Sequence, residues 1–246
     1  LPALQIEFGA TAAQAQWVVE SYALFLAALI LVGGSMGDLY GRKRLFMIGT
    51  VLFAATSVAC GLSPSVEWLI GARALQGIAG AMLTPASLAI ISAFFTDEGA
   101  RGRAIGTWSG FTSITSAFGP VLGGWLVDNA SWRWIFFINV PLAVIVVMVS
   151  ITGVPESRDE DAGRLDWLGA TLATVGLGAL VFGLIEAPVR GWSNQVVMIS
   201  LAVGVVGLIA FVVAEARVTS PMVPLSLFRS STFSGTNILT FLLYGA

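Results

Sequence analysis

The chain has 246 residues, a net charge of −2 and 57% hydrophobic residues, and only 11% of its residues are charged. A typical soluble domain has about 25% charged residues. The 12 basic and 14 acidic side chains are too few to provide a soluble surface for a protein of this length. The composition therefore argues against a soluble enzyme, a nucleic-acid binder and a disordered tail.

The chain contains no His, and Cys60 is its single Cys. These absences exclude a Ser-His-Asp triad and a His-ligated metal, and also an internal disulfide or a Cys-cluster metal site. Residues 33–37 match the G-x-S-x-G esterase elbow, but that elbow needs a His partner. We therefore expect neither an enzyme nor a metal site, and we interpret Cys60 as a packing residue.

Eight apolar segments follow one another, and most of them are long enough to cross a bilayer as a helix. They cover residues 16–37, 45–62, 68–94, 103–127, 133–153, 167–187, 194–214 and 232–246. This pattern predicts an all-α fold, a polytopic transmembrane helix bundle. The chain starts without Met, residues 1–4 look like the tail of a helix, and the last segment stops short. We therefore interpret the chain as a portion of a larger membrane protein.

The basic residues are distributed unequally between the connecting loops. If the segments alternate and residue 1 lies outside, the inside loops contain Arg42, Lys43, Arg44, Arg101, Arg103, Arg158, Arg164, Arg217 and Arg229. The outside loops contain only Arg133 and Arg190. This bias follows the positive-inside rule and predicts a multi-pass protein of the inner or plasma membrane. Residues 154–166 and 217–231 are the two longer inside connectors.

Two ionisable residues lie within the predicted spans. Glu20 lies about one helical turn below Trp17, which we expect to be an outer interfacial anchor. Arg73 lies a similar distance below Trp68. A charge within the membrane costs roughly 3 kcal/mol and therefore faces a bundle interior or a watery cavity. Glu20 could bind and release a proton, or it could stay hydrated near the outer surface. Arg73 could line a transport pathway or have a purely structural role.

Small and polar residues form faces on two segments. One face of segment 68–94 carries Arg73, Gln76, Gly77, Gly80, Thr84 and Ser87. A stripe on segment 103–127 consists of Gly106, Gly110, Ser113, Ala117, Pro120 and Gly124. The polar face predicts contact with other helices or with a central cavity. The stripe predicts either tight packing or a helix that slides or bends against a neighbour, and Pro120 would soften that helix.

The inside loop after the first segment runs Gly34-Ser-Met-Gly-Asp38-Leu-Tyr-Gly41-Arg42-Lys43-Arg44. Gly41 would allow a left-handed or close-packed turn. Asp38 and Arg42 are four residues apart and could pair, and Asp38 could also face the positive end of a neighbouring helix. An ordinary positive-inside loop is the alternative interpretation.

Three motifs at these places resemble the major facilitator superfamily, and in particular its fourteen-helix drug:proton antiporter family. The inside loop is similar to the pattern G-x-L-a-D-r-x-G-r-k through Gly34, Asp38, Gly41, Arg42 and Lys43. Segment 68–94 is similar to R-x-x-Q-G through Arg73, Gln76 and Gly77. Segment 103–127 is similar to G-x-x-x-G-P-x-x-G-G through Gly119, Pro120, Gly123 and Gly124, with Thr115 in place of the first Gly. Residues 132–141 also look like this family.

The resemblance implies a domain organisation. Residues 1–153 would form the N-terminal bundle, corresponding to helices 2–6 of the family, and residues 154–166 a charged inside loop. Residues 167–214 would be two extra linker helices, 215–231 an inside connector, and 232–246 the start of the C-terminal bundle. The family's first helix usually carries an acidic residue for proton coupling, so Glu20 would be a second titratable site or a substitute for it.

The resemblance also implies proton-driven export of lipophilic or cationic drugs and toxic compounds by alternating access. Protons would be the coupling ion, with no bound cofactor and no nucleic-acid partner, and the protein would act as a monomer in the bilayer. In the family, the Arg73 position is associated with proton transfer, and the Asp38 and Arg42 positions with an inside latch. The glycine–proline motif is associated with antiport. The alternatives are a facilitator-type transporter of another metabolite or lipid, and a non-transporting scaffold or receptor.

Overall fold

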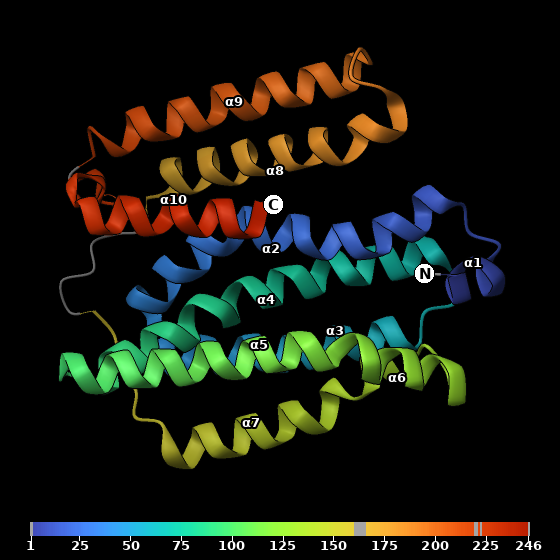
Figure 1. Ribbon diagram of the computed structural model, residues 1–246, viewed down its shortest axis with the longest axis horizontal. Helices are drawn as coiled ribbons and strands as arrows, with labels where there is room; N and C mark the ends of the chain where they lie inside the picture. The colour runs from blue at the N-terminus through green and yellow to red at the C-terminus, as the bar shows by residue number, and fades with distance from the viewer. Residues whose placement is uncertain (1, 160–165, 219–220, 222, 246) are drawn as a thin grey trace.

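The computed structural model describes residues 2–159, 166–218, 221 and 223–245 (Figure 1). The helices are α1 (Pro2–Phe8), α2 (Ala12–Tyr40), α3 (Arg42–Gly61), α4 (Val66–Phe94), α5 (Glu98–Asn129), α6 (Trp134–Phe137), α7 (Asn139–Gly153), α8 (Trp167–Arg190), α9 (Gln195–Glu215), the 3-10 helix η1 (Leu225–Arg229) and α10 (Ser231–Gly245). These residues include no strand, so the predicted all-α class is confirmed.

Six segments of the described chain are long and apolar enough to cross a membrane: α2, α3, α4, α6 together with α7, α8 and α9. The predicted span at 103–127 forms the 32-residue α5, which is not among the six because its many Ser, Thr and Gly residues make it less apolar. The last segment forms α10, whose 15 residues are short for a span.

Successive long helices run in opposite directions. The α2–α3 and α4–α5 junctions lie at the left end in Figure 1, and the α1–α2 and α3–α4 junctions lie at the right end. Each end therefore contains alternate loops, as the distribution of basic residues predicts. Arg164 lies outside the described residues.

Side-chain caps mark where several helices begin. Each cap accepts a hydrogen bond from a free amide of the first helical turn, which has no partner within the helix. The caps are Thr11 on α2, Ser65 on α4, Asp97 on α5, Asp166 on α8 and Asn194 on α9.

The predicted segment at 133–153 is divided between α6 and α7. The break falls at Ile138, between Phe137 and Asn139. Pro141 has no amide proton to donate to the carbonyl of Phe137, so the regular helical ladder is interrupted at this point. The break places Asn139 at the start of α7, where its side chain faces α3.

Small residues allow the helices to approach one another closely. A Cβ on Gly77 of α4 would stand 2.4 Å from the carbonyl oxygen of Tyr22 on α2. A Cβ on Gly176 of α8 would stand 2.9 Å from the amide nitrogen of Leu208 on α9. Backbone contact of this kind is the usual way in which helices associate in lipid. It joins α2 to α4, and α8 to α9.

Candidate functional site

Arg73 lies on α4 and points toward α2. Its Nε donates to the carbonyl oxygen of Val18 at 3.0 Å, and its Nη1 donates to Gln76 Oε1 at 2.7 Å. The guanidinium carbon lies 4.3 Å from the centre of the Tyr22 ring, which is within cation–π range. Among the described residues, no carboxylate forms an ion pair with Arg73. The charge is therefore held by neutral groups inside the bundle.

Gln76 extends this arrangement toward α3 and α7. Its side chain is buried, and its Nε2 donates to Ser57 Oγ at 2.6 Å. Asn139 Nδ2 donates to the same hydroxyl oxygen at 3.3 Å. We call Arg73, Gln76, Ser57 and Asn139 the polar chain. The polar chain was predicted in part, since Arg73 and Gln76 share a face of α4. Ser57 could not be identified as a partner because it lies 19 residues before Gln76.

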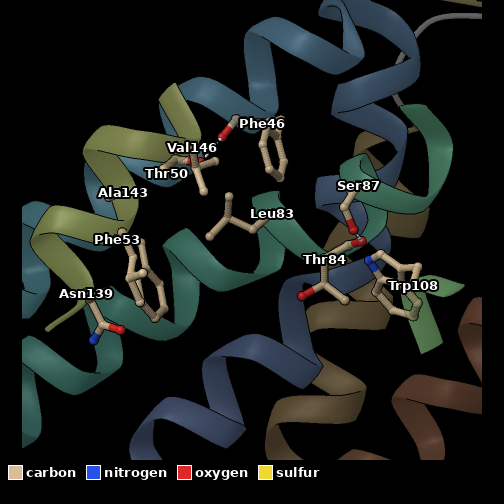
Figure 2. Close-up of a pocket in the computed structure, with 11 residues that line it drawn as sticks. Phe46, Thr50, Phe53, Leu83, Thr84, Ser87, Trp108, Asn139, Ala143 and Val146 are labelled. Carbon is tan, nitrogen blue, oxygen red and sulfur yellow. Dashed lines mark hydrogen bonds between the residues drawn. The ribbon is translucent and has the colours of Figure 1, made fainter. Parts of the chain in front are cut away.

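A pocket of about 300 Å³ lies between α3, α4, α5 and α7 (Figure 2). Aromatic and aliphatic side chains form most of its wall, and polar groups lie at its edges. The lining residues are Phe46, Thr50, Phe53, Leu83, Thr84, Ser87, Trp108, Asn139, Leu142, Ala143 and Val146. None of them is charged, and the volume is at the lower end of the range for small-molecule sites.

Asn139 belongs to both the polar chain and the pocket. Thr84 and Ser87, on the predicted polar face of α4, lie at the other edge of the pocket near Trp108 (Figure 2). A molecule in the pocket could therefore contact a side chain whose hydrogen bond leads through Ser57 and Gln76 to Arg73. Cys60 is fully buried beside Gln76, which agrees with a packing role.

Glu20 is half-buried on α2 and has no hydrogen-bond or ion-pair partner among the described residues. Trp17, which we expect to be an outer interfacial anchor, packs against α8. Its ring centre lies 5.7 Å from that of Phe182, and its Nε1 donates to Glu186 Oε1. The structure therefore leaves the Glu20 carboxylate unpaired and connects the neighbouring turn of α2 to α8.

The inside loop forms more contacts than its sequence predicts. Arg42 donates from Nε and Nη2 to Asp38 Oδ1 at 2.9 and 2.7 Å. Gly41 has a φ of 107°, a conformation that L side chains rarely adopt. Lys43 Nζ donates to the carbonyl oxygen of Ile151 at 3.1 Å. Gly34 packs beside α4, where an added Cβ would stand 3.7 Å from Pro85 Cβ.

Glu156, from the connector after α7, binds the start of α3. Its two carboxylate oxygens accept the amides of Lys43 and Arg44 at 3.0 and 3.1 Å. A carboxylate at these free amides is favoured by the positive end of the α3 dipole. Glu156 was not identified from the sequence. The available signal was that this acidic residue lies in the 154–166 connector, which is predicted on the same side of the membrane as the start of α3.

The stripe on α5 is exposed along its length, and α5 has no buried residue. A Cβ on Gly119 or Gly124 would meet nothing within 4 Å, and one on Gly123 would reach only Ile135 Cδ1 at 4.0 Å. The helix continues through Pro120. Tight packing of this stripe is therefore not seen within the described residues.

Two buried acidic residues escaped the sequence analysis. Glu186 is 4% exposed and forms an ion pair with Arg190, one turn further along α8. Glu215, at the end of α9, is 3% exposed. The signal for Glu186 was its position inside a predicted span with a basic residue four positions later.

Comparison with known proteins gives a consistent result. The family model described as Major Facilitator Superfamily matches residues 1–245. The chain is 41% identical over 234 residues to "Multidrug resistance protein Stp" of Mycobacterium tuberculosis, covering 95% of this chain and 44% of that protein. It is 36% identical over 243 residues to "Tetracenomycin C resistance and export protein" of Streptomyces glaucescens, covering 98% of this chain and 45% of that protein. The chain thus spans about half the length of these relatives.

A solved structure of a bacterial homologue of the human lysosomal transporter Spinster, in an inward-facing and occupied conformation, matches with a TM-score of 0.33 and 17% identity. The match covers 85% of this chain and 62% of that one. The family match and the membrane-spanning helices agree with the predicted multi-pass plasma-membrane protein.

Proposed function

Because this chain belongs to the major facilitator superfamily, we propose that the full protein is a secondary active transporter that exports lipophilic, often cationic, compounds in exchange for protons. The observation that carries this proposal is the polar chain, which starts at the half-buried Arg73 and ends, at Asn139, in an uncharged lipophilic pocket. Intramembrane polar groups are costly and typically mark substrate or proton pathways. The export and resistance functions named for the relatives support the same direction of transport.

In this mechanism two helix bundles rock about a site near the middle of the membrane. Residues 1–153 form part of the first bundle, 167–214 are linker helices, and 232–246 begin the second bundle. The latch of Asp38, Gly41 and Arg42 would stabilise one state at the inside, and the motif around Pro120 would control the change of state. A single polypeptide would suffice, so we expect a monomer.

Among the described residues, we propose Glu20 as the group that binds the proton coupled to transport. Its carboxylate has no cationic partner in the part of the chain that the structure describes, so protonation would remove an uncompensated charge from the bundle. Neutralisation would shift the balance between outward-open and inward-open states. The driving force is adequate, because each charge moved gives about 2.3 kcal/mol per 100 mV and each pH unit about 1.4 kcal/mol per proton.

Everted vesicles containing the full-length protein test this proposal. We expect an acidic lumen to drive accumulation of a lipophilic cation such as ethidium, and a protonophore to abolish it. Glu20→Gln should remove the proton-driven part while the protein still inserts into the membrane. The matched control is Glu67→Gln, which changes an exposed carboxylate in the first turn of α4, at the predicted outer end of that helix. This variant should transport normally. If ethidium accumulates to the same extent with and without the pH gradient, the result would favour a facilitator-type transporter instead.

A further inference from the structure

Asp166 and Glu215 bring two carboxylate oxygens together at the predicted inside end of the α8–α9 pair. Asp166 caps the start of α8, and the buried Glu215 is the last residue of α9. A Cβ on Gly169 would stand 2.6 Å from Asp166 Oδ2 and 2.8 Å from Glu215 Oε1. Both oxygens therefore border the space that a side chain at Gly169 would fill.

Both oxygens are buried, and neither has a hydrogen-bond partner among the described residues. The second oxygen of each carboxylate is satisfied. Asp166 Oδ1 accepts the Gly169 amide at 2.9 Å, and Glu215 Oε2 accepts the Val223 amide at 2.9 Å. A buried acceptor without a donor costs about 1–3 kcal/mol, and two adjacent negative charges add a repulsion. One hydrogen-bond donor placed between Asp166 Oδ2 and Glu215 Oε1 would remove both costs.

No charged side chain of the described residues supplies that donor. Asp166 is the titratable group of α8 that faces Glu215, and the connector contributes the uncharged amide of Val223. Arg217, two residues after Glu215, is exposed and forms no ion pair with either acid. Arg164, two residues before Asp166, lies outside the described residues. The missing group must fit between two oxygens and must be able to donate to one of them.

We propose that Asp166 and Glu215 form a proton-binding site that holds one proton between Oδ2 and Oε1. When Glu215 takes the proton from the inside solution, its Oε1–H donates to Asp166 Oδ2. Glu215 Oε2 still accepts from Val223, and Asp166 Oδ1 still accepts from Gly169. Every oxygen of the pair is then satisfied, and the remaining negative charge lies on Asp166 at the positive end of the α8 dipole.

This site is separate from the polar chain and from Glu20, and it does not depend on the proposed transport function. Glu215 holds the connector through the Val223 amide, so the site links proton binding to the attachment of the segment that leads to α10. Loss of the proton would place two carboxylates against each other and would weaken this attachment.

Infrared spectroscopy of the full-length protein in neutral buffer tests the proposal. A protonated carboxyl has a C=O band separate from that of a carboxylate, and the band shifts in heavy water. We expect Glu215→Gln to remove one such band, because the amide replaces the proton as the donor to Asp166. Asp166→Asn should also remove it, because the Asn amide can donate to Glu215 Oε1 and the pair then needs no proton. An unchanged band in Glu215→Gln would overturn the proposal.

Two further variants and the addition of magnesium chloride test whether the band belongs to the Asp166–Glu215 pair. Gly169→Ala retains both acids but inserts a methyl group between them, so it should also change the band. Glu98→Gln, at an exposed carboxylate in the first turn of α5, should leave the band unchanged. Magnesium chloride alone should have no effect on the wild-type band. Loss of the band on adding magnesium would assign the site to a metal ion and would also overturn the proposal.

Discussion

Trp17 and Glu186 join α2 to α8: the indole Nε1 donates to Glu186 Oε1 at 2.8 Å. The carboxylate is 4% exposed, and its other oxygen accepts from Arg190. A buried hydrogen bond of this kind fixes the proposed linker pair α8–α9 against the first bundle. It lies in the same region of α2 as Glu20, so the position of α8 bears directly on the environment of the proposed proton-binding group.

We predict that Trp17→Phe destabilises the full-length protein by about 1–3 kcal/mol, because the buried Glu186 Oε1 loses its donor. Thermal unfolding in detergent measures the change. The matched control is Trp192→Phe, since Trp192 lies just beyond the same end of α8 and is 63% exposed. The control should change stability by less than about 0.5 kcal/mol. Equal losses in the two variants would contradict the assigned role of this hydrogen bond.

Replacement of Gly41 by Ala should weaken the turn between α2 and α3 and its contact with Glu156. The φ of 107° is unfavourable for an L residue, and the added Cβ would stand 2.9 Å from Glu156 Oε1. We expect a loss of about 1–3 kcal/mol in unfolding measurements. Gly71→Ala provides the comparison, because a Cβ there meets nothing within 4 Å and Gly71 is in a helix interior. That change should stabilise the protein by up to about 1 kcal/mol, and a loss of similar size in both variants would contradict the prediction.

Glu7 should make stability depend on acid pH. The hydrogen bond from Trp132 Nε1 and then that from Arg133 hold the pKa of Glu7 below its ordinary value of 4.5, although partial burial opposes them. A lowered folded-state pKa gives stability that is present above the unfolded value and is lost as pH falls through the folded value. Because the carboxylate is 40% exposed, the gain should stay below about 1 kcal/mol.

The measurement is the melting temperature of wild type and Glu7→Gln as pH falls from neutral to strongly acidic. The two curves should be separated at neutral pH and should converge below pH 4.5. A constant separation across the whole range would show that Glu7 contributes no pH-dependent stability.

The helices of this fold could be predicted from the sequence better than the contacts between residues far apart in the chain. The spans, the alternation of the helices and the Asp38–Arg42 pair follow from local composition and spacing, which act within one or two helical turns. Ser57 and Glu156 could not be identified in this way, because their partners lie 19 and more than 100 residues away. Glu215 was missed since it lies at the edge of a predicted span, where a charged residue looks like part of a loop.

The exposed stripe on α5 gives a prediction that separates transport from stability. Gly124 is an exposed residue, and a side chain there meets nothing within the described residues. Gly124→Val should therefore change the free energy of unfolding by less than about 1 kcal/mol, the scale of a β-branched residue in a helix. If the glycine–proline motif controls the change of state, the same variant should lose most of its efflux. Unimpaired efflux would remove Gly124 from the mechanism.

The most direct test of proton exchange is to follow both solutes in one preparation. The full-length protein is reconstituted in liposomes with a pH indicator inside, and ethidium is added outside without an imposed pH gradient. The proposed antiport predicts that ethidium entry is accompanied by proton loss from the lumen, and that Glu20→Gln abolishes this proton movement. Ethidium entry through the wild-type protein with no change in internal pH would contradict proton-coupled antiport.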